Sequence, residues 1–141
     1  TTVYAWAPGA RLSAPMLALR AEPDAHAAPA QFVFDRGQLN PADATAQGVL
    51  AFVVSASSGE REDLQARVLQ QGARQLGLSL QPLLSVVEKR ATFACTPGLE
   101  RPGPHMAPGL FAAGDYVQGP YPATLEGAVR SGVAAARLAN R

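Results

Sequence analysis

The stretch that most constrains the fold covers residues 108–140, because it has the pattern of a strand, a tight loop and a helix in immediate succession. The apolar run at residues 110–113 is too short for a helix and ends at Gly114, where the missing Cβ lets another group approach the backbone. Asp115 follows at once, so its carboxylate stands just past a strand end. In that position it could accept a hydrogen bond from a ligand hydroxyl.

A helix is predicted to begin near Pro122, whose fixed φ and missing N–H suit the first helical position, and to end at Asn140. Its start would present free N–H groups and a partial positive charge, which suit an electron-rich or anionic ligand. A plain strand-loop-helix unit with Asp115 as a turn residue fits the same pattern. Two stripes at three- and four-residue spacing run along the helix: an apolar one of Leu125, Ala128, Val129, Gly132, Val133 and Ala136, and a small-residue one of Gly127, Ser131 and Ala135. The small stripe would let the helix lie close to a sheet or a flat ligand.

Composition limits the class of protein. The net charge of the 141 residues is +1 and the basic residues are scattered, so neither nucleic acid nor an anionic membrane surface is indicated as a partner. The single cysteine, Cys95, lies in an apolar run and is expected to be a buried, inert thiol. No metal site is expected, and His26 and His105 are predicted at the surface. With no signal peptide and no apolar run near the roughly 20 residues that span a bilayer, we expect a cytoplasmic protein.

Residues 1–95 are predicted to be rich in strands. Alternating or apolar runs predict strands within residues 1–7, 12–20, 31–35, 48–55 and 80–95, the last as one long or two short strands. The fourth run is apolar on both faces, so we expect it at the centre of the sheet. A turn is predicted at residues 35–37, a loop at residues 21–30, and Trp6 is expected to be a core aromatic residue.

An amphipathic helix is predicted between the last two strands, and it ends at Leu76 with Gly77 as its stop. Ser57 and Glu60 have the spacing of a capping box at its start. Its inward residues would be Leu64, Val68, Leu69 and Leu76, and its solvated polar face would carry Arg61, Gln65, Arg67, Gln71 and Arg74. The fold class predicted for the whole chain is therefore α+β, with a mixed sheet.

Two motifs carry a resemblance to a known family. Gly-Leu-Phe-Ala-Ala-Gly-Asp-Tyr at residues 109–116 precedes Tyr-Pro-Ala-Thr-Leu-Glu-Gly-Ala-Val-Arg-Ser-Gly at residues 121–132. This segment resembles the C-terminal FAD-binding segment of the flavin amine oxidase and phytoene desaturase superfamily. Together with Glu-Lys-Arg-Ala-Thr-Phe-Ala-Cys-Thr-Pro-Gly at residues 88–98 and with Arg101-Pro102, it is similar to the group of squalene-associated FAD-dependent desaturases, also described as hydroxysqualene dehydroxylases.

The resemblance implies that FAD is the cofactor of the intact protein. The cofactor-binding residues that it implies are Gly114, Asp115, Pro122, Ala123, Thr124 and Leu125. The first two would touch the ribityl–phosphate portion of FAD, and the last four would lie near the pyrimidine end of the flavin ring. No catalytic side chain is implied, because the flavin itself moves the hydride.

The resemblance also divides the chain. Residues 1–97 would be part of a substrate-binding domain, residues 98–108 a crossover linker, and residues 109–141 the C-terminal strand-loop-helix of an incomplete, Rossmann-like FAD-binding domain. The fingerprint Gly-x-Gly-x-x-Gly is absent, so the N-terminal Rossmann portion of the same protein would be a missing partner. We therefore expect a fragment that is inactive and holds no FAD by itself. Its last helix would pack on the fragment, on another copy or in an altered position.

The implied substrate is a large apolar isoprenoid such as hydroxysqualene, which would be reductively dehydroxylated to squalene. Peripheral contact with the inner membrane and assembly into a homo-oligomer both stay open. Two other readings also stay open. A relative that acts on amines or on protoporphyrinogen would use the same FAD contacts, and a cofactor-free α+β binding module would use none.

Overall fold

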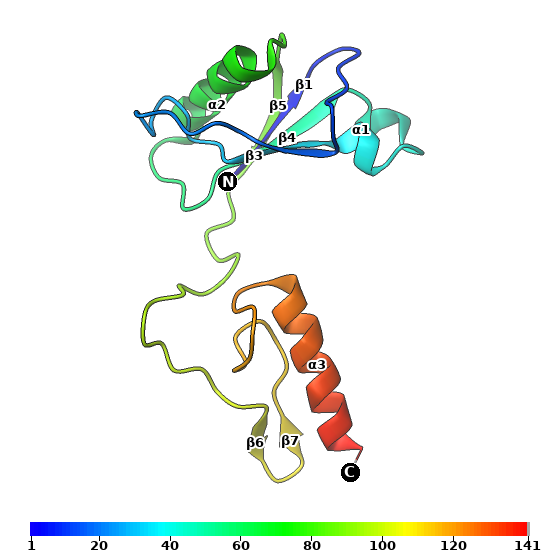
Figure 1. Cartoon of the computed structure of the whole chain (residues 1–141), viewed down its shortest axis with the longest axis vertical. Coiled ribbons are helices and arrows are strands. Elements are labelled where there is room, and N and C mark those ends of the chain that lie inside the picture. Colours follow the sequence, from blue (N-terminus) through cyan, green and yellow to red (C-terminus); the bar gives the residue numbers. More distant parts are fainter. Residues whose placement is uncertain (141) are drawn as a thin grey trace. The chain divides into compact units, whose positions relative to one another are not determined.

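The structure is a computed structural model that describes residues 1–140, and the chain forms two compact units, Thr1–Glu88 and Lys89–Arg141 (Figure 1). Both helices and strands are present, which confirms the α+β class. The assignment of residues 1–97 to a substrate domain and of residues 109–141 to a flavin domain stays a prediction. The predicted linker, residues 98–108, lies within the second unit.

The first unit contains a five-stranded sheet in the order β2-β3-β4-β1-β5. The strands are β1 (Thr2–Trp6), β2 (Met16–Ala18), β3 (Phe32–Asp35), β4 (Val49–Val53) and β5 (Gln81–Val86). Every pairing is antiparallel, which corrects the expectation of a mixed sheet. The apolar strand β4 lies at the centre of the sheet, as its sequence predicts.

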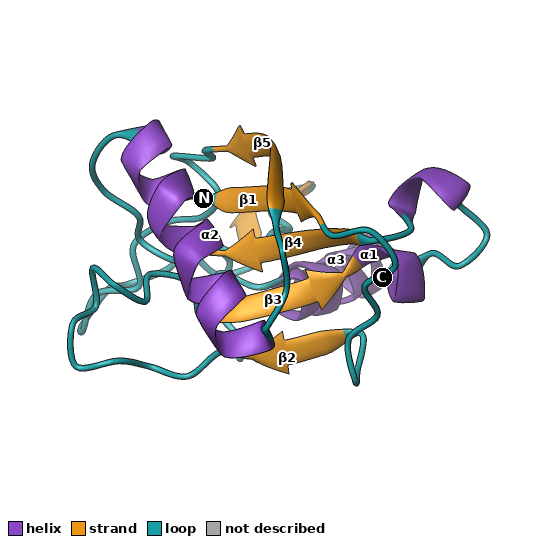
Figure 2. Ribbon diagram, turned by 90° about the horizontal axis from the view of Figure 1, so that it is seen from above, coloured by secondary structure: helices purple, strands orange, loops and turns teal. Residues whose placement is uncertain are grey.

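Helix α2 (Arg61–Leu76) lies across the strands and covers one face of this sheet (Figure 2). Val3, Phe52 and Val33 stand opposite one another on neighbouring strands and are fully buried on that face. Gly72 lets the helix come close, because a Cβ there would lie 2.8 Å from the ring of Phe52 and 2.6 Å from Leu80. The core therefore forms between α2 and the middle of the sheet.

The two ends of α2 differ in how well their sequence predicts them. Gly77 caps the C-terminal end in the left-handed conformation, with φ of 69°, as predicted. At the other end the N-cap is Glu60 and no side chain caps the helix, so the predicted capping box is wrong. The hydroxyl of Ser57 instead shares a hydrogen bond with that of Thr1.

The polar face of α2 fastens the loop at residues 21–30 to the helix. Gln71 is fully buried, and its amide both accepts a hydrogen bond from Ala30 N–H and donates one to Ala30 C=O, each at 2.9 Å. Gln75 forms the same pair of bonds with Arg20, at 2.8 and 2.9 Å. The expectation of a solvated face is therefore wrong at Gln71, because the backbone of the loop needs partners where it crosses the helix.

A short helix begins within residues 35–37, where the sequence predicted a turn. Asp35 is the N-cap of this helix, α1 (Arg36–Leu39), which is followed by the 3-10 helix η1 (Ala44–Ala46). The carboxylate is buried and accepts bonds from Leu12 N–H at 3.0 Å and from the side chain of Gln38 at 2.7 Å. Burial alone would raise the pKa of Asp35, but these hydrogen bonds outweigh it and hold the pKa below its ordinary value.

The second unit contains a small hairpin and a long helix. Strands β6 (His105–Ala107) and β7 (Leu110–Phe111) pair with each other antiparallel, and β6 lies in the segment predicted to be a linker. Helix α3 (Leu125–Ala139) begins three residues later than predicted, since its N-cap is Thr124. Pro122 cannot be in the helix because its two neighbours have a positive φ.

The predicted burial of two side chains, Cys95 and Trp6, is wrong. Cys95 is exposed and belongs to no strand or helix, because β5 ends at Val86 and the strand predicted to reach Cys95 does not continue. Trp6 is 38% exposed rather than a core residue, because it lies on the sheet face opposite to α2. His26 and His105 are exposed, as predicted.

Candidate functional site

Gly114 and Asp115 form a corner just after β7, and contacts from both sides hold it. Gly114 N–H donates a hydrogen bond to Ser131 Oγ at 2.7 Å, and that hydroxyl lies 2.9 Å from the carbonyl oxygen of Gly114. Asp115 Oδ2 accepts a bond from the hydroxyl of Thr92 at 3.1 Å. We call these two residues the Gly114–Asp115 corner; its supports lie 17 and 23 positions away in the sequence.

The start of α3 adjoins this corner, because Ala123 N–H donates to the carbonyl oxygen of Asp115 at 3.3 Å. Thr124 caps the helix by accepting from Gly127 N–H at 3.0 Å. The N–H groups of Leu125 and Glu126 precede the first bond within the helix, so they are available to an acceptor outside it. A carboxylate and a helix start with free donors are thus neighbours, as the sequence predicted.

The loop between the corner and α3 is held in a strained shape. Tyr121 and Ala123 have φ values of 59° and 58°, a conformation that costs a residue other than glycine about 1–2 kcal/mol. Arg101 fastens the loop by donating to the carbonyl oxygens of Val117 at 2.9 Å and Gly119 at 2.6 Å. Such strained residues cluster at ligand sites, where the surrounding structure holds them in place.

All six predicted cofactor residues lie in this loop or at its ends. The half-buried ones are Gly114, Asp115 and Ala123, and the exposed ones are Pro122, Thr124 and Leu125. Leu125 is 88% exposed, so its side chain does not pack on the loop.

Sequence reasoning did not assign a supporting role to the three side chains that hold the loop, namely Thr92, Arg101 and Ser131. Thr92 lies in the motif at residues 88–98, and Ser131 is the one hydroxyl in the small stripe of α3. A hydroxyl among apolar or small residues was the clue that could have identified Thr92 and Ser131.

The two stripes of α3 face different surroundings. The small stripe faces the loop, since Gly127 and Ala135 are buried and a Cβ at position 127 would lie 2.2 Å from the carbonyl oxygen of Tyr121. The helix therefore packs on its own unit, in line with one of the expected arrangements. Three residues of the apolar stripe are instead strongly exposed: Leu125 at 88%, Val129 at 64% and Val133 at 48%.

In the first unit, the sheet face opposite to α2 is apolar and open. Tyr4 pairs with Ala51 on one side and with Leu84 on the other, and Ala51 pairs with Phe34, so these side chains share that face. Its largely exposed apolar members are Trp6, Met16, Phe32, Leu84 and Val86. An apolar surface of this kind usually marks an interaction or ligand-binding surface.

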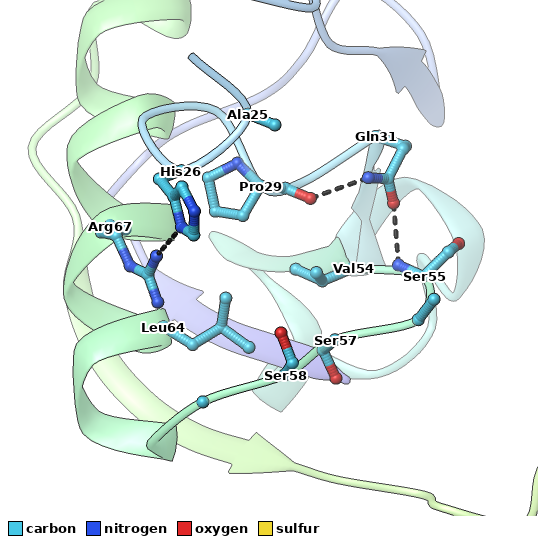
Figure 3. Close-up of a pocket in the computed structure, with 12 residues that line it drawn as sticks. Ala25, His26, Pro29, Gln31, Val54, Ser55, Ser57, Ser58, Leu64 and Arg67 are labelled. Carbon is cyan, nitrogen blue, oxygen red and sulfur yellow. Dashed lines mark hydrogen bonds between the residues drawn. The ribbon is translucent and has the colours of Figure 1, made fainter.

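A cavity of about 330 Å³ opens between the loop at residues 25–31, residues 54–59 and the start of α2 (Figure 3). Arg67 Nη1 lies 3.0 Å from His26 Nδ1 across it, and Gln31 donates to Pro29 C=O and accepts from Ser55 N–H, both at 2.8 Å. Because a guanidinium only donates, His26 Nδ1 is the acceptor. These bonds join the two loops and the helix, so the lining polar groups serve mainly to fasten the loops.

Within residues 1–140, no three His, Cys, Asp or Glu side chains are grouped so that they could hold a metal ion. None of the helices described there has the length and apolar character needed to cross a membrane.

The model of one protein family, described as flavin containing amine oxidoreductase, matches residues 21–140. Two curated relatives are both named hydroxysqualene dehydroxylase. The one from Rhodopseudomonas palustris is 45% identical over 83 residues, which cover 55% of this chain and 20% of the relative. The one from Sinorhizobium fredii is 51% identical over 63 residues, which cover 43% of this chain and 15% of the relative. The match thus spans a fifth or less of each relative, and no solved structure matches the chain.

Proposed function

This chain belongs to the family of flavin-containing amine oxidoreductases, and we propose that it is a segment of an FAD-dependent oxidoreductase that acts on a large apolar isoprenoid such as hydroxysqualene. The observation that carries the proposal is the Gly114–Asp115 corner beside the free N–H groups at the start of α3. In a member of this family, the carboxylate would meet a hydroxyl of the ribityl chain of FAD, and the helix start would meet the flavin ring.

The residues at the corner fit FAD. Asp115 Oδ2 is engaged by Thr92, while Oδ1 has no hydrogen-bond partner among the described residues and could accept from a ribityl hydroxyl. Gly114 lacks a Cβ that would lie 2.5 Å from the ring of Tyr116, so it lets the chain turn tightly beside Asp115. FAD would supply the hydride chemistry, and the protein would supply binding and orientation.

The start of α3 would serve the pyrimidine end of the flavin. Pro122, Ala123, Thr124 and Leu125 would lie there, with the N–H groups of Leu125 and Glu126 directed at the ligand. The partial positive charge of a 15-residue helix favours electron density near its start. The helix start would therefore stabilise the flavin ring in its reduced form, which carries more negative charge.

The open sheet face supports an apolar substrate. A hydrocarbon offers few polar atoms, so its binding depends on buried apolar area, worth about 25 cal/mol per Å². Aromatic and aliphatic side chains such as Tyr4, Phe34 and Leu84 share the face opposite to α2, where the first two are half-buried and Leu84 is exposed. The hydroxysqualene dehydroxylases among the relatives favour an isoprenoid over an amine or a porphyrinogen.

We also propose that the 141-residue chain neither retains FAD nor turns over by itself. The residues here provide one side of a flavin site and contain no Gly-x-Gly-x-x-Gly fingerprint for the pyrophosphate. The partner would be the Rossmann portion of the same protein. The exposure of Val129 and Val133 on α3 supports it, because an apolar stripe of this kind needs a covering surface.

The test is the flavin absorbance spectrum of the purified chain beside that of the longer protein that carries it. Flavin in the longer protein alone supports the proposal, and no flavin in either supports a cofactor-free binding module. Conversion of hydroxysqualene by the flavin-loaded protein, followed by mass spectrometry, tests the substrate. Turnover of an amine or of protoporphyrinogen in its place would contradict the isoprenoid assignment.

A further inference from the structure

The contacts around Asp115 carry a further inference, which rests on the proposed function. We propose that Thr92 is a positioning residue for the cofactor. Its hydroxyl holds one oxygen of Asp115 so that the other oxygen faces the ligand hydroxyl. Ser131 fixes the backbone of Gly114 next to it.

The bond from Thr92 determines which oxygen of Asp115 is free. An ionised carboxylate is an acceptor at both oxygens, and the torsion that exchanges them is broad in aspartate. The hydroxyl of Thr92 lies 3.1 Å from Oδ2, so it restrains that torsion before any ligand arrives. Oδ1 has no other partner in residues 1–140 and is left to accept from the ligand.

Ser131 restrains the backbone on which Asp115 stands. Its oxygen accepts from Gly114 N–H at 2.7 Å and lies within 3.0 Å of two carbonyl oxygens, those of Gly114 and Ala128. A hydroxyl has one hydrogen, so it donates to one of these carbonyls at a time. Val117 N–H also donates to the Gly114 carbonyl at 3.3 Å, so both polar groups of the glycine are held.

The arrangement gives a physical reason for the two motifs to occur together. Thr92 belongs to the motif at residues 88–98, and Gly114, Asp115 and Ser131 belong to the segment at residues 109–132. The two motifs meet at the carboxylate. A site ordered in advance loses less entropy when its ligand binds, so Thr92 contributes to affinity without touching the cofactor.

The test is a double-mutant cycle in the longer, flavin-loaded protein with Thr92→Val, Asp115→Asn and the double variant. Thr92→Val should weaken FAD binding about five-fold, the loss expected for one hydrogen bond. If Thr92 acts through Asp115, the double variant should bind FAD no more weakly than Asp115→Asn alone. Thr92→Ser keeps the hydroxyl and should restore the affinity.

A matched control exists in the first unit. Thr45 donates to Asp43 at 2.6 Å in an exposed Thr–Asp pair outside the corner, so Thr45→Val should leave FAD affinity unchanged. Additive effects of Thr92→Val and Asp115→Asn, or an unchanged affinity in Thr92→Val, would overturn the inference.

A second measurement uses the 141-residue chain without flavin. The bond from Thr92 to Oδ2 also restrains χ1, the torsion that carries the whole carboxylate of Asp115. The three-bond NMR couplings of Asp115 report χ1, and they should show one rotamer in the wild type and an average of rotamers in Thr92→Val. Averaged couplings in the wild type would overturn the inference, whatever the cofactor. Ordered couplings in a longer protein that binds no flavin would instead refute the proposed function and keep Thr92 as the residue that positions Asp115.

Discussion

Two glycines of α3 offer a test of how this helix packs. A Cβ at Gly127 would lie 2.2 Å from the carbonyl oxygen of Tyr121, whereas a Cβ at Gly132 would meet nothing within 4 Å. Both positions are inside the same helix, so the intrinsic preference for alanine is the same at each. The difference between Gly127→Ala and Gly132→Ala therefore isolates the contact with the loop.

The two substitutions should have opposite signs. Gly132→Ala should stabilise α3 by about 1 kcal/mol, the usual advantage of alanine over glycine in a helix. At Gly127 the obstacle is a backbone oxygen, which cannot move aside as a flexible side chain can. Overpacking of this kind costs about 1–3 kcal/mol, and a shift of the helix would also weaken the cap from Thr124 to Gly127 N–H. We expect Gly127→Ala to destabilise α3 by about 1–2 kcal/mol after the gain in propensity.

Hydrogen exchange measured by NMR gives the free energy of opening for the amides of α3, without requiring the two units to unfold together. Exchange in Gly132→Ala should slow about five-fold, as expected for about 1 kcal/mol, and exchange in Gly127→Ala should accelerate. Equal slowing in both variants would refute the reasoning, because it would mean that the small stripe does not rest on the loop.

Three further outcomes are expected. Gln71→Leu leaves both backbone groups of Ala30 unpaired and should lower the free energy of unfolding by about 3 kcal/mol in urea titrations; a loss below about 1 kcal/mol would contradict the burial of this amide pair. The pKa of Asp35 is lowered by folding, so its stabilising contribution is present above the unfolded value of about 3.9 and is lost as the pH falls through the lower folded pKa. Urea titrations at neutral and acidic pH should therefore show a smaller acid-induced loss in Asp35→Asn than in the wild type, and equal losses would contradict this account. Ser131→Ala should accelerate exchange at the amide of Gly114, and unchanged exchange there would contradict the role of that hydroxyl.

Much of the fold follows from local pattern. The strands at residues 2–6, 32–35 and 49–53 lie where alternating or apolar runs predict them, and α2 ends where Gly77 predicts its end. The corner of glycine and aspartate after β7 also lies where the sequence placed it, next to the start of α3. These features depend on the chain's own periodicity and on the backbone freedom of glycine, which neighbours in the sequence already determine.

The sequence did not predict which distant segments contact one another. The sequence alone showed a polar face on α2 and two stripes on α3, but it did not show which partners they meet. Tertiary structure decided that Gln71 is buried against Ala30, that the small stripe of α3 faces the loop, and that Thr92 reaches Asp115. The physical reason is that a buried backbone group or carboxylate takes its partner from whichever segment the fold brings within hydrogen-bond distance, and periodicity along one helix or strand does not encode that segment.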